Sequence, residues 1–319
     1  MRAVQYERVG GPEVLRVNNV PTPEPGSGEV LVEVRAASVD ASEAVIRAGK
    51  LRGFVRGRFP RRLGSDFAGH VVALGPGVHA WSVGDDVWGL MPHYAFGALA
   101  DYVVVPGQRL ARAPENLSLL DAAALPVSGT TALTALTDKA GLKSGERLLV
   151  RGASGAVGSL VVQLGKAFGA HVTGLAGAAN LDLVTELGAD VALDYRTTRP
   201  EELGSFDVIV DLVGTHISAY LARLTRGGRM VALAFDQDRI LTSMATLILR
   251  FAVDRRIKVF SNNPSPERIA GLTTAVEAGS IRPVIDTVFP LTGIAEVHRR
   301  LEAGGVRGKH VIDMRLDRA

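Results

Sequence analysis

One short segment constrains the fold of this chain more than any other, because a strand, a glycine-rich turn and an apolar helix follow one another within residues 147–168. The strand Arg147–Val150 leads into Gly152-Ala153-Ser154-Gly155-Ala156-Val157-Gly158, and the helix continues to Phe168. Small residues let a backbone approach a pyrophosphate, and a helix N-terminus presents free N–H groups to it. No Gly-Lys-Ser/Thr follows the glycines, which excludes a P-loop. The segment therefore predicts a dinucleotide-binding turn.

The central region repeats this alternation of strand and helix. Its apolar runs are too continuous for a sheet with one solvated face, which indicates parallel strands covered on both faces. The expected strands are Arg147–Val150, His171–Ala176, Val191–Asp194, Val208–Val213, Met230–Ala234 and Ile257–Phe260, and the expected helices are Ala156–Phe168, Leu181–Leu187, Ile217–Leu224 and Thr242–Val253. We therefore expect a doubly wound, Rossmann-type α/β unit.

The two ends of the chain follow a different pattern. Up to about Pro114, short alternating strands are separated by Gly/Pro-rich turns, which is typical of a β-rich unit. Near the other end, Ser265 and Pro266 mark the start of a helix that Gly279 ends. A second helix, Ile294–Ala303, leads to a last strand, Lys309–Met314, which we expect to rejoin one of the two sheets.

Composition matters here for what it excludes. The 319 residues include no Cys, which rules out thiolate zinc sites, iron–sulfur clusters and disulfides. The 7 His are scattered along the sequence, so no metal site is predicted. The formal net charge of +3 gives little reason to expect a nucleic-acid partner. No stretch is long and apolar enough for a membrane span or a signal peptide, so we expect a cytoplasmic protein.

The end of the second expected strand bears on which cofactor is bound. An acidic residue at that point binds the adenosine ribose 2′-hydroxyl and repels a 2′-phosphate. The stretch Thr173–Asn180 contains no acid, which favours NADP(H). It contains no Arg or Lys either, so NAD(H) stays open. Asn180 and the later Tyr195 offer hydrogen bonds to this part of a cofactor.

Several separated segments together resemble the medium-chain dehydrogenase/reductase superfamily, and in particular its zinc-free quinone oxidoreductase branch. The segments are Leu63–Gly69, Val83–Val87, Leu125–Ala132, Ala153–Gly158, Pro283–Asp286 and Arg307–Lys309, in the order expected for that branch. The resemblance implies a β-rich, chaperonin-10 (GroES)-like substrate domain made of residues 1–120 and 263–319. It also implies an inserted Rossmann domain of residues 121–262, and homodimers.

The resemblance and the glycine turn together indicate the candidate site residues. Expected cofactor-binding residues are Ser154, Gly155, Ala156, Val157, Gly158, Asn180, Tyr195, Val213, Gly214, Ala234 and Phe235. Thr131 falls where this branch places a Thr near the nicotinamide carboxamide, although a hydroxyl at a helix N-terminus is an equal alternative. Asp40 takes a position at which the family often has an Asn lining the substrate site. Asp40 is then a polar group of the pocket, a proton donor if burial raises its pKa, or a turn cap.

The same resemblance argues against a metal. Zinc alcohol dehydrogenases of the superfamily carry a Cys, a Gly-His-Glu and a second Cys where this chain has Asp40, Gly64-Ser65-Asp66 and Val127-Ser128. Without a Lewis acid, hydride transfer suits an acceptor that delocalises the charge developing on its oxygen. We therefore expect a zinc-independent oxidoreductase that uses NADPH to reduce small-molecule quinones or conjugated enones.

Two alternatives stay open at this point. One is an enoyl or 2-enal reductase of the same superfamily, which would use the same hydride with a different acceptor. The other is a cofactor-binding regulatory or RNA-binding protein with little turnover. Its only support is the run between Arg47 and Arg62, which contains Arg and Lys but no acid. A nucleic-acid partner is therefore not our expectation.

Overall fold

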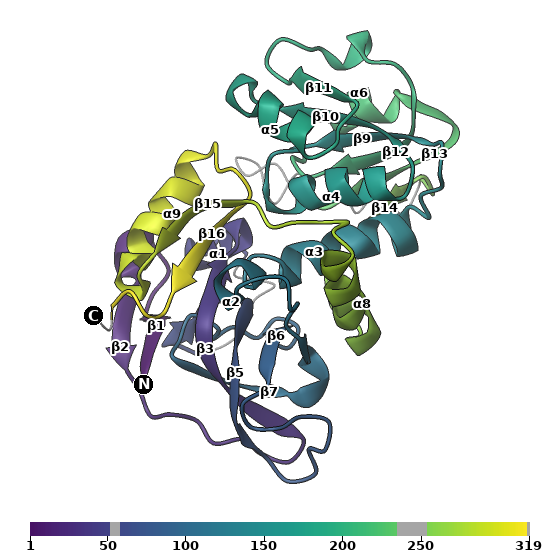
Figure 1. Ribbon diagram of the computed structural model, residues 1–319. Helices are drawn as coiled ribbons and strands as arrows, with labels where there is room; N and C mark the ends of the chain where they lie inside the picture. The colour runs from purple at the N-terminus through teal and green to yellow at the C-terminus, as the bar shows by residue number, and fades with distance from the viewer. Residues whose placement is uncertain (52–57, 235–253, 318–319) are drawn as a thin grey trace. The chain divides into compact units, whose positions relative to one another are not determined.

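The computed structural model describes residues 1–51, 58–234 and 254–317, and the chain forms two compact units. The first unit comprises Met1–Thr130, Asn263–Gly279 and Pro283–Ala319, and the second comprises Thr131–Asn262 and Ser280–Arg282. Both ends of the chain thus build the first unit, in which purple and yellow elements lie side by side in Figure 1.

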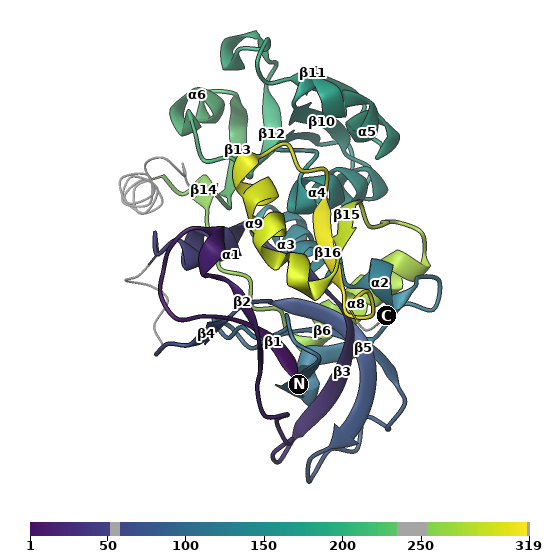
Figure 2. The same cartoon turned by 90° about the vertical axis from the view of Figure 1, so that its left-hand side faces the viewer.

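A six-stranded parallel sheet forms the centre of the second unit. Its order is β11-β10-β9-β12-β13-β14, the doubly wound arrangement of a Rossmann fold. The strands are β9 (Arg147–Arg151), β10 (His171–Ala176), β11 (Val191–Asp194), β12 (Phe206–Asp211), β13 (Leu224–Ala232) and β14 (Ile257–Lys258). The helices α4 (Ala156–Ala167) and α5 (Leu181–Glu186) lie on one face and α6 (Ile217–Leu221) on the other, as Figures 1 and 2 show. The predicted fold class is confirmed.

The apolar runs of the central region explain why this sheet is buried. Leu149, Ile209 and Val231 are fully buried, since helices cover both faces of the strands that carry them. The largest difference at a helix end is at α6, which ends at Leu221 rather than at Leu224, because Leu224 pairs with Phe206 and begins β13. The predicted helix Thr242–Val253 lies outside the described residues.

The first unit is rich in strands, as predicted. One sheet has the order β2-β1-β4 and a larger one β15-β16-β3-β5-β6-β8, with β7 also paired to β3. The strands are β1 (Arg2–Tyr6), β2 (Arg16–Asn19), β3 (Glu29–Val39), β4 (Arg61–Arg62), β5 (Asp66–Leu74), β6 (Asp86–Leu90), β7 (Tyr102–Pro106), β8 (Leu110–Arg112), β15 (Ile285–Phe289) and β16 (Lys309–Asp313). The last strand pairs antiparallel with β3, so the chain returns to the sheet of its first part.

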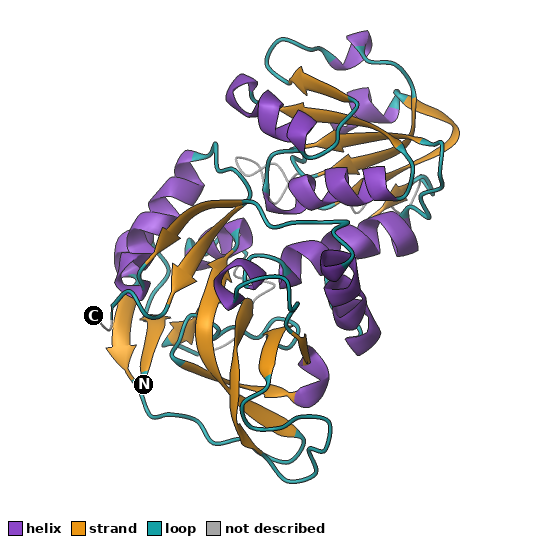
Figure 3. Cartoon of the chain, in the orientation of Figure 1, coloured by secondary structure: helices purple, strands orange, loops and turns teal. Residues whose placement is uncertain are grey.

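Helices accompany these strands, as Figure 3 shows. They are α1 (Ala41–Arg47), α2 (Leu119–Ala122), α8 (Pro266–Glu277) and α9 (Ile294–Ala303), while α3 (Pro126–Thr134) continues into the second unit. The α8 start follows the prediction, since the Ser265 side chain accepts a hydrogen bond from the Arg268 N–H and Pro266 takes the first helical position. Among the described residues, no helix is long and apolar enough to cross a membrane.

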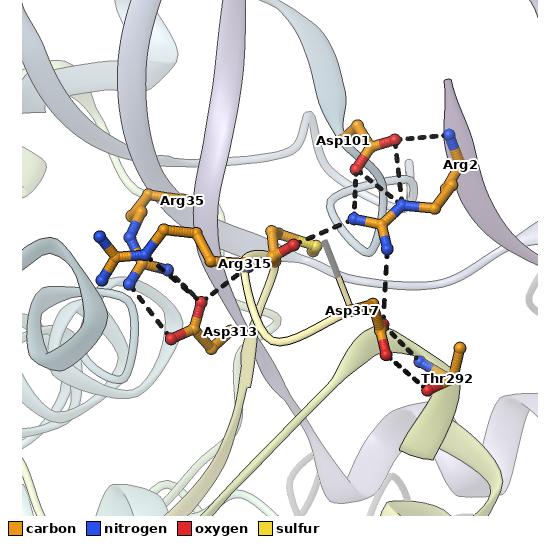
Figure 4. Close-up of polar contacts among 8 residues, drawn as sticks. Arg2, Arg35, Asp101, Thr292, Asp313, Arg315 and Asp317 are labelled. Carbon is orange, nitrogen blue, oxygen red and sulfur yellow. Dashed lines mark hydrogen bonds and ion pairs between the residues drawn. The ribbon is translucent and has the colours of Figure 1, made fainter. Parts of the chain in front are cut away.

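Ion pairs fix the returning chain end to β1 (Figure 4). The Arg2 guanidinium lies 2.9 Å from the Asp101 carboxylate and donates to the Met314 carbonyl oxygen at 3.0 Å. It also approaches Asp317, whose carboxylate accepts hydrogen bonds from the Thr292 backbone and hydroxyl. The segment after β16 is therefore held against the first strand of the chain.

Candidate active site

The glycine turn after β9 forms a tight backbone cradle in the second unit. A Cβ at Gly158 would lie 2.0 Å from the Gly152 carbonyl oxygen, so only glycine fits at position 158. Gly155 is the N-cap of α4 and provides no side-chain hydrogen bond to the first turn. The N–H groups at the start of this twelve-residue helix are thus available to an anion. Of the predicted residues, the structure brings Ser154 to Gly158 together here.

The parallel pairing of β10 with β11 gathers polar side chains beside this cradle. Ala176 pairs with Asp194, so the residues that follow each strand come close together. A Cβ built on Gly177 would lie 3.3 Å from Nη1 of Arg196 and 3.7 Å from Cε1 of Tyr195. The Asn180 amide donates to Ser154 Oγ at 3.3 Å, which joins this group to the cradle. An adenosine ribose binds at this edge of the sheet in the doubly wound fold.

A buried ion pair shapes the loop after β12. Arg151 Nη1 lies 2.8 Å from Asp211 Oδ1, and the two side chains are 5% and 0% exposed. The same oxygen accepts the N–H groups of Val213 and Gly214, at 3.0 and 3.2 Å. Burial raises the pKa of the Asp211 carboxyl, and the Arg151 guanidinium opposes that rise. The predicted pair Val213-Gly214 therefore follows the carboxyl end of β12 in a loop that Asp211 holds.

The remaining predicted residues of the second unit belong to neither the cradle nor the loop after β12. Ala234 follows the end of β13, and Phe235 lies outside the described residues. Thr131 is buried in the middle of α3, which begins at Pro126, so the alternative of a hydroxyl at a helix N-terminus is wrong.

The first unit contains a buried lysine among carboxylates. Lys309 is 3% exposed, and its Nζ donates to Asp40 Oδ1 at 2.6 Å and to Ser38 Oγ at 2.8 Å. It lies 3.7 Å from Asp66 Oδ2, an oxygen that also accepts the Val127 N–H at 3.0 Å. Burial lowers the pKa of the Lys309 ammonium, but the carboxylates of Asp40 and Asp66 outweigh this and raise it. The side chain is therefore a charged ammonium.

Asp40 is the most exposed side chain of this cluster. It is the N-cap residue of α1, but its side chain makes no capping hydrogen bond, so the turn-cap alternative is wrong. Oδ2 is buried and has no hydrogen-bond partner in the described part of the chain, although the side chain as a whole is 14% exposed. Asp40 is thus a partly exposed carboxylate that Lys309 orients.

Sequence reasoning missed several of these groups. Arg196 follows β11 rather than β10, and only the strand register brings it beside Gly177. Lys309 stands 269 positions after Asp40, at the start of the last strand. A signal existed in both cases, since Arg196 lies two positions after a predicted strand and Lys309 is the first residue of another. Arg151 offered a similar signal, because it is a charged residue that directly follows the apolar run Leu148–Val150.

Comparison with known proteins agrees with both halves of this architecture. Residues 26–115 match the family model described as an alcohol dehydrogenase GroES-like domain, and residues 187–312 match one described as a zinc-binding dehydrogenase. The chain is 33% identical to a chloroplast envelope quinone oxidoreductase homolog of Arabidopsis thaliana, over 98% of each protein. It is 35% identical to a 2-methylene-furan-3-one reductase of Solanum lycopersicum, over 98% of this chain and 79% of that protein.

A solved structure is similar along the whole chain. A mycobacterial protein determined as a complex with NADPH is 27% identical, with a TM-score of 0.82 over 98% of this chain and 99% of that one. Together with the matched families and the two plant relatives, this similarity settles the relationship. The chain belongs to the medium-chain dehydrogenase/reductase superfamily, in its quinone oxidoreductase-like branch.

Proposed function

We propose that this protein is an oxidoreductase that prefers NADPH and reduces quinones or conjugated enones without a metal ion. The observation that carries the proposal is the backbone cradle between Gly152 and Gly158, which has no room for any side chain at position 158. Such a cradle at a helix N-terminus fits the pyrophosphate of a dinucleotide. A nicotinamide dinucleotide bound there would supply a hydride.

The residues of this chain divide the work of binding. The backbone N–H groups at the start of α4, from Ala156 to Gly158, would hold the pyrophosphate, while Ser154 and Gly155 would border it. Asn180, Tyr195 and Arg196 would contact the adenosine ribose and its 2′-phosphate, and the loop Val213-Gly214, fixed by Asp211, would border the rest of the cofactor. Thr131 and Ala234 stay predictions for the nicotinamide end.

The preference for NADPH depends on Arg196 in this proposal. We expect Arg196→Gln to weaken NADPH binding by roughly 10- to 100-fold, the effect of losing a hydrogen bond to a charged group. NADH binding should hardly change, since NADH has no 2′-phosphate. Fluorescence titration with both cofactors measures this, with Arg199→Gln as the control because Arg199 is exposed in the same loop. An equal loss for NADPH and NADH would contradict the assignment.

Zinc does not fit the residues of the first unit that match the zinc-binding segments of related dehydrogenases. The Lys309 ammonium lies between Asp40 and Asp66, and it already supplies the positive charge that these carboxylates need. No group of three metal-ligating side chains occurs among residues 1–51, 58–234 and 254–317. We propose that the reaction involves no zinc.

Removal of metals tests this proposal directly. We expect dialysis against a chelator to leave turnover unchanged, and added zinc to produce no increase. The measurement is the steady-state rate before and after dialysis, with metal content determined by mass spectrometry on the same samples. A loss of turnover that zinc restores would overturn the metal-free proposal.

The acceptor class follows from the same chemistry. Hydride addition to a conjugated carbonyl spreads the negative charge over the acceptor, so no metal has to stabilise it. The names of the two plant relatives specify a quinone oxidoreductase homolog and a reductase of 2-methylene-furan-3-one, which is a conjugated enone. The test is NADPH oxidation with quinones, enones, 2-enals and saturated aldehydes. Turnover of saturated aldehydes alone would contradict the proposal.

The structure removes one member from the basic run on which the RNA-binding alternative rests. Arg47 begins the basic run, but its side chain is fully buried and pairs with Glu302 of α9. A buried, paired guanidinium cannot belong to a solvated surface that attracts phosphates.

We also propose a homodimer, as the family resemblance implies, which sedimentation analysis would detect as twice the mass of the chain.

A further inference from the structure

Glu43 is a buried carboxyl group with an unusual set of neighbours in the first unit. It lies on α1, three positions after Asp40, and its side chain is fully buried. Oε2 accepts the Gly64 N–H at 3.1 Å, and Oε1 lies 3.4 Å from the Ser65 hydroxyl. None of the reaction steps described above uses this group.

The charges around Glu43 decide its protonation state. The pKa of the Glu43 carboxyl is raised to about 8, mainly by burial and next by the Asp40 carboxylate, with a smaller contribution from Asp66. The hydrogen bond from the Gly64 N–H and the Lys309 ammonium oppose this rise. Two fully buried carboxyl groups, Glu43 and Asp66, and the partly exposed Asp40 therefore share one ammonium, and such groups do not all ionise together.

Burial also raises the pKa of the Asp66 carboxyl, but Lys309 at 3.7 Å and hydrogen bonds from Ser38 Oγ and the Val127 N–H oppose that rise. No cation of the described residues lies within ion-pair distance of Glu43, so we assign the proton at neutral pH to Glu43.

Other titratable groups face this part of α1 as well. Tyr6 of β1 lies close enough to Glu43 and Arg47 for both to affect the pKa of its hydroxyl, and it accepts a hydrogen bond from Arg61 of β4. Helix α9 packs against α1 and brings His298 and Glu302 to the far side, where Glu302 pairs with Arg47. Arg47 is paired with Glu302 of α9 rather than with Glu43, and His298 is neutral.

Resting on the proposed function, we propose that Glu43 stores the proton that the reduced acceptor takes up, and that the Ser65 hydroxyl passes it on. Ser65 is partly exposed, whereas Glu43 is fully buried, so the proton of Glu43 would leave through the Ser65 hydroxyl. A hydroxyl both accepts and donates, which allows it to relay a proton. Glu43 acts through Ser65 and never touches the acceptor.

The step balances in atoms and charge. Hydride addition forms a C–H bond on the acceptor and leaves negative charge on its oxygen. The O–H bond of the Glu43 carboxylic acid breaks as its proton moves to Ser65 Oγ, and the Ser65 proton forms the O–H bond of the product. Glu43 is left as a carboxylate, and water returns the proton before the next turnover. Lys309 stabilises the extra negative charge in the meantime.

The pH dependence of turnover is the first readout. Above a pH of about 8, Glu43 of the wild type is ionised and the store is empty, so kcat should fall. Glu43→Gln keeps the shape but carries no acid. We expect it to lower kcat at neutral pH by about 100-fold, the usual size of a proton-transfer contribution, and to remove the fall near pH 8. Ser65→Ala should give a similar loss at a partly exposed position.

Infrared spectroscopy provides a second readout that needs no turnover. The wild type should show a carboxylic-acid carbonyl band component that disappears near pH 8. Glu43→Gln should lack this component, Ser65→Ala should retain it, and Glu13→Gln, which changes an exposed carboxylate of the same unit, should match the wild type in both readouts.

The outcomes separate this inference from the function on which it rests. Wild-type turnover without the band component, or a Glu43→Gln variant with the wild-type rate and pH profile, would overturn the proton store alone. A wild type that fails to oxidise NADPH with every quinone and enone offered would overturn the proposed function, and the catalytic role of Glu43 with it, even if the band were present.

Discussion

Replacing Gly155 by Asp is expected to abolish NADPH binding while the protein stays folded. Gly155 is the N-cap residue of α4, with a φ of −79° and a ψ of 177°, a conformation that any residue adopts. A Cβ there would approach nothing closer than the Gly152 carbonyl oxygen, at 3.4 Å, which is an ordinary contact. Asp is moreover among the best N-cap residues, and its charge interacts favourably with a helix N-terminus. We therefore expect an unchanged or higher Tm.

The same carboxylate would stand where the pyrophosphate has to bind. A like-charge contact costs several kcal/mol in a binding site, which corresponds to a loss of affinity of roughly 100-fold or more. Gly155→Asn is the matched control, since it has the same shape and caps a helix equally well but carries no charge. Calorimetric titration with NADPH compares the variants. Equal affinities for Gly155→Asp and Gly155→Asn would show that the pyrophosphate does not bind at this turn.

The second large effect is expected from Lys309→Met. The substitution leaves the carboxylates of Asp40 and Asp66 without the ammonium that lies 2.6 and 3.7 Å from them. Removing one partner of a buried ion pair costs about 3–5 kcal/mol of unfolding free energy, because the remaining charge stays buried. Urea unfolding at neutral pH measures this loss.

The chain offers a matched control for this experiment. Lys166 also pairs with an aspartate, Asp190, but its side chain is 47% exposed. Exposed pairs contribute at most about 1 kcal/mol, so Lys166→Met should have a small effect. Adding Asp40→Asn to Lys309→Met should recover part of the lost stability, since one unpaired charge is then removed. Equal effects of Lys309→Met and Lys166→Met would contradict the role assigned to the buried ammonium.

Much of the second unit could be predicted because its signals are local. The strand before Gly152, the small residues up to Gly158 and the apolar helix follow one another without interruption, and continuous apolar runs are characteristic of parallel strands buried on both faces. The end of α6 was less predictable. Leu224 fits a helical pattern, but its pairing with Phe206 on the neighbouring strand decides the outcome.

The charged cluster of the first unit could not be predicted in the same way. Asp40, Asp66 and Lys309 lie on three different strands or strand ends, and the antiparallel pairing of both β16 and β5 with β3 brings them together. No local pattern encodes that pairing. The resemblance to a known family indicated Asp40 as a site residue, but neither Lys309 nor Glu43 was predicted, because burial and long-range contacts give these side chains their properties.

In the function proposed for this protein, NADPH bound at the Gly152–Gly158 cradle delivers hydride to a conjugated carbonyl acceptor. The most direct test follows the near-ultraviolet absorbance of NADPH after the wild type and Gly155→Asp are each mixed with a quinone or a conjugated enone. We predict that the wild type consumes one NADPH per acceptor reduced and that Gly155→Asp, at the same NADPH concentration, consumes almost none. Consumption at equal rates by the two proteins, or no consumption by the wild type with any acceptor, would contradict it.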